Sequence, residues 1–176
     1  MELRGPRVLL RPYRMDDAEA LFAAVDASRD HLNRWLRFAR FHQTLDDTRN
    51  YIADGSAKWL RREAFSLGIW DAARGVLLGD TRLLPTSWDI PAFEIGYWLA
   101  RAAEGQGYMT EAAGLIVEAA FDVFAARRVT ILCDTRNERS AAVARRLGFA
   151  EAGRLRNTLR APDGVLSDTL ILVKTS

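Results

Sequence analysis

The hydrophobic positions of the chain follow two different periods, and the change falls near residue 64. Before that point apolar residues recur every three or four positions over 16–28, 31–38 and 45–63, which is the spacing of amphipathic helices. Thr44 stands directly before the third stretch and is a candidate N-cap. A short apolar run over 7–12 predicts a strand. The first third is therefore expected to hold one strand followed by helices.

After residue 64 the period shortens to two, and strands dominate. The segments 65–71 and 76–84 flank a short turn and predict a β-hairpin, and a loop is expected over 85–91. Further strands are expected over 93–99, 128–134, 149–159 and 166–174, and helices over 108–124 and 140–147. Gly148 is a candidate C-cap for the last helix. No repeat or linker interrupts the pattern, so we expect an α/β (α+β) fold in a single domain spanning 1–176.

The composition limits the expected partners and the expected cellular compartment of the protein. The net charge is +2, which demands neither a nucleic acid nor an anionic membrane as a partner. Cys133 is the only cysteine, so no disulfide can form within the chain, as suits a reducing compartment. The N-terminus has no apolar signal region, and no apolar run reaches the roughly 18 residues of a membrane span. We therefore expect a cytoplasmic protein without nucleic-acid or membrane partners.

A glycine-rich turn carries the clearest chemical signal. Gly105, Gln106 and Gly107 lie between a predicted strand and the strongest predicted helix. The start of a helix offers N–H groups without intrahelical partners, and glycine lets the backbone approach an anion closely. The turn therefore predicts an anion site, with an ordinary tight connection as the alternative. A dinucleotide fingerprint would need a third glycine where Thr110 stands, and a Walker A loop would need a lysine that is absent.

The run around this turn, IGYWLARAAEGQGYMTEA, resembles the acetyl-CoA-binding motif of the GNAT N-acetyltransferases. The chain is most similar to the RimJ/RimL branch, which acetylates N-terminal amines of ribosomal proteins. Segments before and after the turn match that branch in the same order, namely VLLRPYRMDDAEAL, HLNRWLRFA, TRNERSAAVARRLGFAEAG and DGVLSDTLILV. The resemblance thus covers nearly the whole chain. Its one departure at the turn is Ala102, where the family usually has Gln or Arg, although Arg101 sits one residue earlier.

The resemblance implies a strongly twisted, mixed but mostly antiparallel sheet flanked by helices and splayed between 93–99 and 128–134. Acetyl-CoA would lie in the splay as the cosubstrate, its pyrophosphate held by backbone N–H groups of the turn and its pantetheine arm paired with the preceding strand. The implied cofactor-binding residues are Trp98, Leu99, Arg101, Gly105, Gln106, Gly107, Tyr108, Met109, Thr110, Asn137 and Ser140. Candidate partners for the 3′-phosphate are Arg101, Arg136 and Arg139.

Two residues are candidates for proton transfer. Glu94 stands on the strand that would border the thioester and is the candidate general base, with pairing across the sheet as the alternative. The RimL-like branch has been assigned a different glutamate near the C-terminus, and residues 159–160 do not supply it. Many relatives use a tyrosine to protonate the leaving thiolate, but Ala144 occupies that position. Ser140 matches the serine that serves the thiolate in RimL-like enzymes.

The acceptor is the least defined part of the prediction. The expected acceptor is the N-terminal amine of a ribosomal or other protein; a small amine (antibiotic, polyamine or amino-acid derivative) and a non-catalytic acyl-CoA sensor remain open. Candidate walls for the acceptor groove are Trp35, Phe38, Phe41 and Trp88. Core packing is the alternative for each, and it is stronger for Trp35, which continues an apolar stripe. His31 and His42 would flank it, and they make no metal-ligand set with Cys133. A homodimer is expected by analogy alone.

Overall fold

The computed structural model describes residues 1–36, 41–160 and 164–176. Within these residues the strands form one sheet in the order β1-β2-β3-β4-β5-β6-β8-β7. The strands are β1 (Leu3–Arg4), β2 (Val8–Arg11), β3 (Phe65–Asp71), β4 (Leu77–Ser87), β5 (Ala92–Leu99), β6 (Arg128–Asp134), β7 (Ala150–Arg160) and β8 (Leu166–Thr175). The helices are α1 (Ala18–Asp26), α2 (Arg29–Leu32), α3 (Leu45–Leu60), α4 (Tyr108–Asp122) and α5 (Glu138–Arg146), with 3-10 turns η1 (Met15–Asp17) and η3 (Arg101–Ala103).

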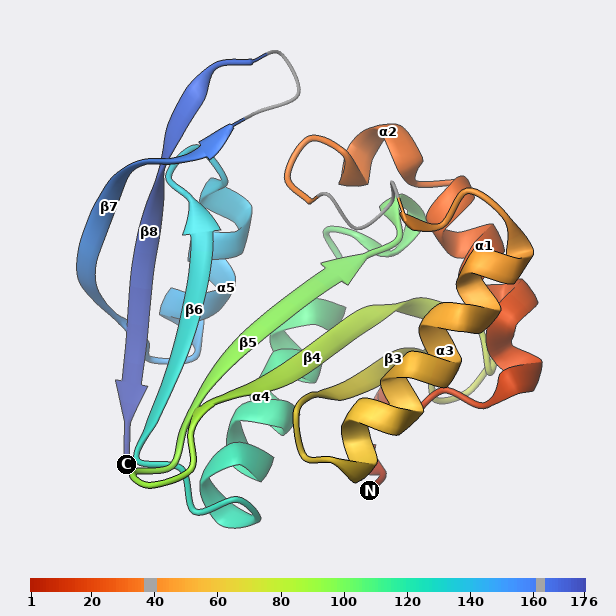
Figure 1. The fold of residues 1–176 in the computed structure, drawn as a ribbon, viewed down its shortest axis with the longest axis horizontal. Coiled ribbons are helices and arrows are strands. Elements are labelled where there is room, and N and C mark those ends of the chain that lie inside the picture. The colour runs from red at the N-terminus through yellow and green to blue at the C-terminus, as the bar shows by residue number, and fades with distance from the viewer. Residues whose placement is uncertain (37–40, 161–163) are drawn as a thin grey trace.

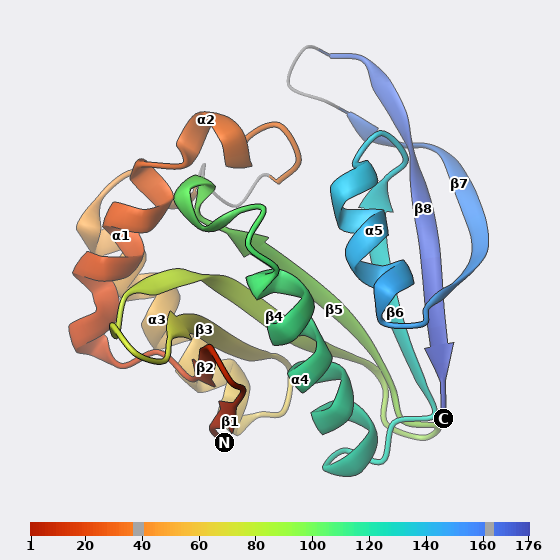
Figure 2. The same cartoon turned by 180° about the vertical axis from the view of Figure 1, so that it is seen from behind.

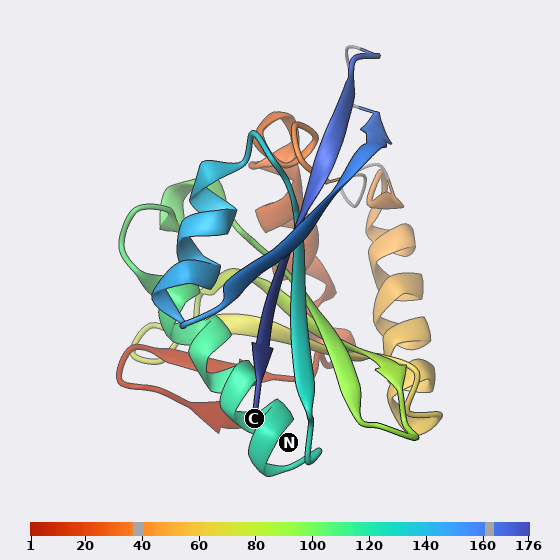
Figure 3. The ribbon, with the colours of Figure 1, turned by 90° about the vertical axis from the view of Figure 1, so that its left-hand side faces the viewer.

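The sheet opens between β5 and β6, which are parallel neighbours, whereas all other adjacent strands pair antiparallel. They pair only from Ala92 to Ile95 on β5 and from Arg128 to Ile131 on β6. Beyond that point the two strands diverge, as Figure 1 shows. The mixed, mostly antiparallel sheet and its splay are therefore confirmed. Figure 3 shows how strongly the sheet twists between its two ends.

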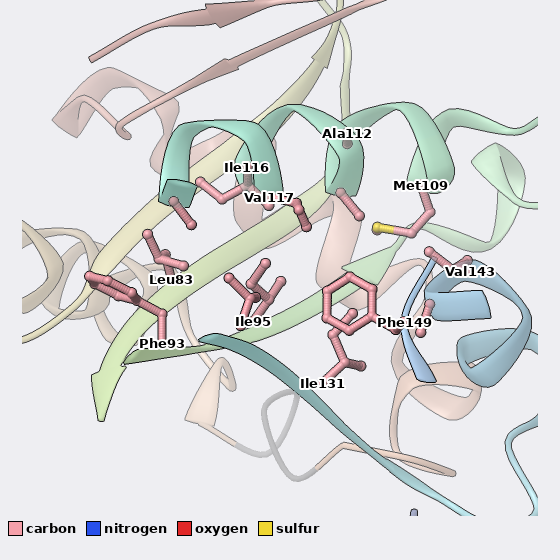
Figure 4. Packing of buried hydrophobic residues seen from close by; sticks show 14 of the residues in the cluster. Leu83, Phe93, Ile95, Met109, Ala112, Ile116, Val117, Ile131, Val143 and Phe149 are labelled. Atoms are coloured by element: carbon pink, nitrogen blue, oxygen red, sulfur yellow. The ribbon is translucent and has the colours of Figure 1, made fainter. Parts of the chain in front are cut away.

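Helices cover both faces of the sheet. α1 and α3 lie on one face, and α4 and α5 lie on the other (Figures 1 and 2). The main core forms between the sheet and α4, where buried side chains of β4, β5 and β6 meet the alanine-rich face of the helix (Figure 4). The strands contribute Leu83, Phe93, Ile95 and Ile131, and α4 contributes Met109, Ala112, Ile116 and Val117. A second cluster around Trp70 and Trp98 fills the α1/α3 face.

Several element boundaries differ from the sequence prediction for local reasons. β4 continues through Pro85 to Ser87, in the segment expected to be a loop. Its neighbour β3 begins at Phe65, opposite Leu83, so no residue of β3 lies opposite Pro85 and its missing N–H is tolerated there. α3 stops at Leu60, three residues early, and Arg62 adopts a left-handed φ of 58°. β1 is only two residues long, too short to produce a pattern.

The predicted caps are confirmed. The side chain of Thr44 accepts a hydrogen bond from the Asp47 N–H, and Asp47 bonds back to the Thr44 N–H in a capping box. Gly148 follows α5 with a φ of +81°. The second predicted helix begins earlier and is shorter in the described residues, where it spans Arg29–Leu32. Phe38, which that helix was expected to carry, lies outside the described residues.

Candidate active site

The glycine turn forms a sharp, open entry to α4. Gly105 and Gly107 have φ values of +75° and +83°, and Gly107 is the N-cap residue. The first intrahelical bond runs from the Glu111 N–H to the Gly107 carbonyl. The N–H groups of the first turn, from Tyr108 onward, therefore have no acceptor within the helix. Because these groups point out of the helix end together with its positive dipole, they form an anion site.

Arg7 contacts this turn and the first turn of α4, and the sequence pattern did not reveal these contacts. Its guanidinium donates to the Gln106 carbonyl at 2.8 Å and to the Glu111 carboxylate at 2.8 Å. The same carboxylate accepts the Arg7 backbone N–H at 2.7 Å. The guanidinium also lies 5.0 Å from the centre of the Tyr108 ring. Arg7 thus fixes the carbonyl side of the turn, which leaves the N–H side free for a ligand.

The inner edge of β5 presents peptide groups toward the splay. The Ala100 N–H donates to the Leu78 carbonyl of β4 at 2.8 Å. Because successive peptide groups of a strand point to opposite edges, those of Trp98 also face β4, and those of Tyr97 and Leu99 face the splay. The Trp98 indole is buried in the cluster on the α1/α3 face. The structure therefore directs Leu99 and Tyr97, rather than Trp98, toward an extended ligand.

Ser140 is joined to Tyr97 across the splay. The Ser140 hydroxyl donates to the Tyr97 hydroxyl at 3.2 Å, and the Tyr97 hydroxyl donates to the Ser140 carbonyl at 3.1 Å. Asn137 caps α5 by accepting the Ser140 N–H at 3.2 Å, so its side chain supports the turn that holds Ser140. Burial raises the pKa of Tyr97 to about 12, so its hydroxyl stays protonated near neutral pH. Burial also raises the pKa of the neighbouring Cys133 thiol.

Glu94 lies on the opposite face of β5 from Tyr97, because side chains alternate along a strand. The side chain is partly exposed, and burial raises its pKa, an effect that Arg82 partly offsets. In the part of the chain that the structure describes, no ion pair of Glu94 is found. Glu94, which lies opposite Thr130 of β6, and Tyr97, which is bonded to Ser140, are therefore on opposite faces of β5.

Comparison with known proteins assigns this arrangement to a family. The sequence pattern of the "Acetyltransferase (GNAT) domain" family matches residues 7–150. The chain belongs to the GNAT acetyltransferase family. It is 32% identical over 154 residues to the Bacillus subtilis protein described as "Putative ribosomal N-acetyltransferase YdaF", covering 86% of this chain and 82% of that protein.

Solved structures agree with the assignment. RimJ of Mycobacterium smegmatis, in complex with a CoA disulfide, is 26% identical with a TM-score of 0.88, covering 100% of this chain and 86% of that one. RimL, the ribosomal L7/L12 α-N-protein acetyltransferase in complex with coenzyme A, has the same fold at 21% identity, with a TM-score of 0.92 and coverage of 99% and 98%. This GNAT chain is therefore an acyl-CoA N-acyltransferase, and its relatives support the RimJ/RimL branch.

Two of the three arginines expected near the 3′-phosphate of CoA are already held in ion pairs in this GNAT chain. Arg136 forms two bonds of 2.7 and 3.0 Å with the Asp134 carboxylate, whose pKa this pairing lowers to about 2. Arg139 pairs with Glu104 at 2.8 Å. Arg101 has an exposed side chain, and its backbone N–H donates to the Ser28 hydroxyl at 3.1 Å.

The residues expected to wall the acceptor groove of the GNAT chain do not gather in one place. Trp88 packs against Phe93 at the end where β5 and β6 pair, with ring centres 5.3 Å apart. Trp35 and Phe41 are 37% and 71% exposed in the segment around α2. His42 is fully buried and lies 3.0 Å from the Thr48 hydroxyl, so it has a packing role.

Two further observations describe the GNAT chain as a whole. Among the described residues, no three or more histidine, cysteine, aspartate or glutamate side chains gather as metal ligands would. Within the same residues, no helix is long and apolar enough to cross a membrane.

Proposed function

We propose that this enzyme transfers the acetyl group of acetyl-CoA directly to the N-terminal amine of a protein, with ribosomal proteins as the expected class. Three features support the cofactor half of the proposal, namely the N–H groups at the start of α4, the unpaired edge of β5 at Leu99 and the hydroxyl of Ser140. They would receive the pyrophosphate, the pantetheine arm and the sulfur of acetyl-CoA.

The cofactor would be held mainly by the backbone. The N–H groups of Gln106, Gly107, Tyr108 and Met109 would bind the pyrophosphate, with Thr110 completing the first helical turn. The peptide groups of Tyr97 and Leu99 would pair with the pantetheine arm. The Leu99 N–H would then polarise the thioester carbonyl, as an oxyanion donor does.

The transfer requires a neutral amine and a stabilised leaving group. The amine nitrogen attacks the thioester carbon, the C–N bond forms and the C–S bond breaks. Glu94 takes the proton of the amine directly or through water, which is a modest demand because an N-terminal amine has a pKa near ~8. The Ser140 hydroxyl turns its single proton from the Tyr97 oxygen to the departing thiolate and donates a hydrogen bond to it, while Tyr97 stays bonded to the Ser140 carbonyl and holds the residue in place. Glu94 and Ser140 thus act on the two sides of the transferred acetyl group.

The relatives support a protein acceptor, because YdaF, RimJ and RimL carry ribosomal-protein names or belong to that branch. A screen of peptides with free N-termini against acetyl-CoA, read out by release of the CoA thiol, tests this directly. Release with peptides and not with polyamines or aminoglycosides would support the proposal. Release of the CoA thiol with small amines only would show that the acceptor is a small amine and not a protein. Tight acetyl-CoA binding without release of the thiol would favour a non-catalytic sensor.

A further inference from the structure

A chain of side-chain contacts connects the glycine turn to helices on both sides of the splay. Glu104 directly precedes Gly105, and its two carboxylate oxygens have different partners. Its Oε1 lies 2.8 Å from His31 Nε2 on α2, and its Oε2 lies 2.8 Å from Arg139 Nη1 on α5. Figure 2 shows the loop between β5 and α4 lying between α2 and α5. Glu104 therefore connects α2 to α5 at the residue that precedes the glycine turn.

The position of this carboxylate needs an explanation. A negative charge only a few residues before the N–H groups of α4 would repel a bound pyrophosphate. Here the carboxylate is contacted by His31 Nε2 and by the Arg139 guanidinium, and only 21% of the Glu104 side chain is exposed. The His31 side chain is 14% exposed, whereas that of Arg139 is 66% exposed. Water screens an exposed ion pair strongly, so the pair with Arg139 contributes little and the shielded contact with His31 is the main anchor.

The turn also has a reason to need anchoring. Gly105 and Gly107 have more backbone freedom than any other residue type, and a ligand that had to order them would bind more weakly. Arg7 holds the turn on its C-terminal side through the Gln106 carbonyl. Glu104 holds it on its N-terminal side through His31 and Arg139. Together these contacts fix the turn in its open shape before any ligand arrives.

We infer that Glu104 is a positioning residue for the cofactor: it anchors the glycine turn between α2 and α5 and so strengthens acyl-CoA binding. This inference rests on the proposed binding of the acetyl-CoA pyrophosphate at the start of α4. It gives His31, on α2, a direct link to the cofactor loop.

The Glu104→Gln variant of the full chain separates anchoring from simple charge repulsion. Removing a negative charge beside an anion site would by itself tighten binding. The anchoring role predicts the reverse: the Kd for acetyl-CoA measured by isothermal titration rises about tenfold, a change of roughly 1.4 kcal/mol. The KM for acetyl-CoA rises in parallel, while kcat stays within about twofold, because the reacting groups are untouched. An unchanged or lower Kd would overturn the inference.

Matched variants identify the cause of the change. Glu138→Gln makes the same chemical change on α5, where the side chain is 78% exposed, and should leave the Kd unaltered. His31→Gln keeps an N–H donor and should retain most of the affinity, whereas His31→Leu should match Glu104→Gln. Combining His31→Leu with Glu104→Gln should add little to Glu104→Gln alone, because the contact between the two residues is weakened in both single variants. Additive losses would contradict a shared role.

The same titration separates failure of this inference from failure of the proposed function. A wild-type chain that binds no acetyl-CoA would overturn both. A wild-type chain that binds acetyl-CoA while Glu104→Gln binds equally well would overturn only the positioning role. Circular dichroism of each variant checks that it is folded. If Glu104→Gln does not fold, His31→Leu and His31→Gln still decide the question, and equal affinities for the two would contradict it.

Discussion

The hydroxyls of Ser140 and Tyr97 are hydrogen-bonded to each other across the splay, with 3.2 Å between the two oxygens. Tyr97 donates in turn to the Ser140 carbonyl, so two hydrogen bonds join the two residues. Ser140 comes from the start of α5 and Tyr97 from β5, and neither could hold this geometry alone. The pair links α5 to β5, the strand along which the pantetheine arm of the cofactor would lie.

Removing the Tyr97 hydroxyl should slow the reaction without weakening cofactor binding. A neutral hydrogen bond contributes about 1 kcal/mol, so Tyr97→Phe should lower kcat by about five- to tenfold. Because Tyr97 acts through Ser140, the Tyr97→Phe/Ser140→Ala double variant should be no slower than Ser140→Ala alone. Steady-state rates of CoA release give both values. Multiplying losses would show that the two hydroxyls act separately.

Glu94 should control the acidic limb of the rate profile. A base must be deprotonated to act, and burial raises the pKa of Glu94, so the rate should fall at a pH above the usual range of a carboxyl group. Glu94→Gln should lower the rate near neutral pH by about a hundredfold and recover at high pH, where the amine is already neutral. The measurement is kcat/KM of the acceptor from pH 5 to 10. A parallel profile in wild type and variant would remove Glu94 as the base.

Substitution at Gly107 should abolish cofactor binding. Its φ of +83° disfavours a side chain, and an added Cβ would lie 3.3 Å from Arg7 Nη2. Gly107→Val should therefore displace the turn and raise the Kd for acetyl-CoA beyond the range of titration. Gly75→Val is the matched control, since its φ is +67° but a Cβ there meets no atom within 4 Å. Equal binding by both variants would refute the placement of the pyrophosphate.

His42 should make the fold sensitive to acid. Burial lowers its pKa in the folded state to about 4, from 6.5. As the pH falls through that interval the unfolded chain takes up a proton that the folded chain does not, so stability declines by at most about 3 kcal/mol. Urea unfolding at pH 7 and pH 4.5 should show a smaller loss for His42→Gln than for wild type. The same loss in both would contradict this account of His42.

The sequence predicted the elements that carry a strong local pattern. β3 and β6 begin and end where alternation predicted, and α4 begins at Tyr108 as expected because a wide apolar stripe follows two glycines. Pro85 misled the prediction of β4, because the tolerance of proline there depends on where the neighbouring strand begins. The position of that neighbouring strand follows from the pairing of β3 with β4 and cannot be read from the residues around Pro85.

The contacts that build the site were beyond the sequence pattern because they join distant residues. Arg7 reaches Glu111 across 104 positions, and Tyr97 reaches Ser140 across 43. The direction of the Trp98 peptide groups depends on the register of β5 against β4, which the Ala100 N–H bond to Leu78 fixes. A family motif marks the residues near a cofactor, but it does not say which of two adjacent peptide groups faces it.

Acetyl transfer to a protein N-terminus is the central claim, and mass spectrometry of acceptor peptides tests it most directly. Peptides with free N-termini and an internal lysine are incubated with the enzyme and acetyl-CoA, and the modified position is read by fragmentation. Transfer to a protein N-terminus gives one acetyl group on the α-amine, formed in step with CoA release and lost when the N-terminus is blocked. Acetylation of the lysine instead, or of small amines only, would contradict it.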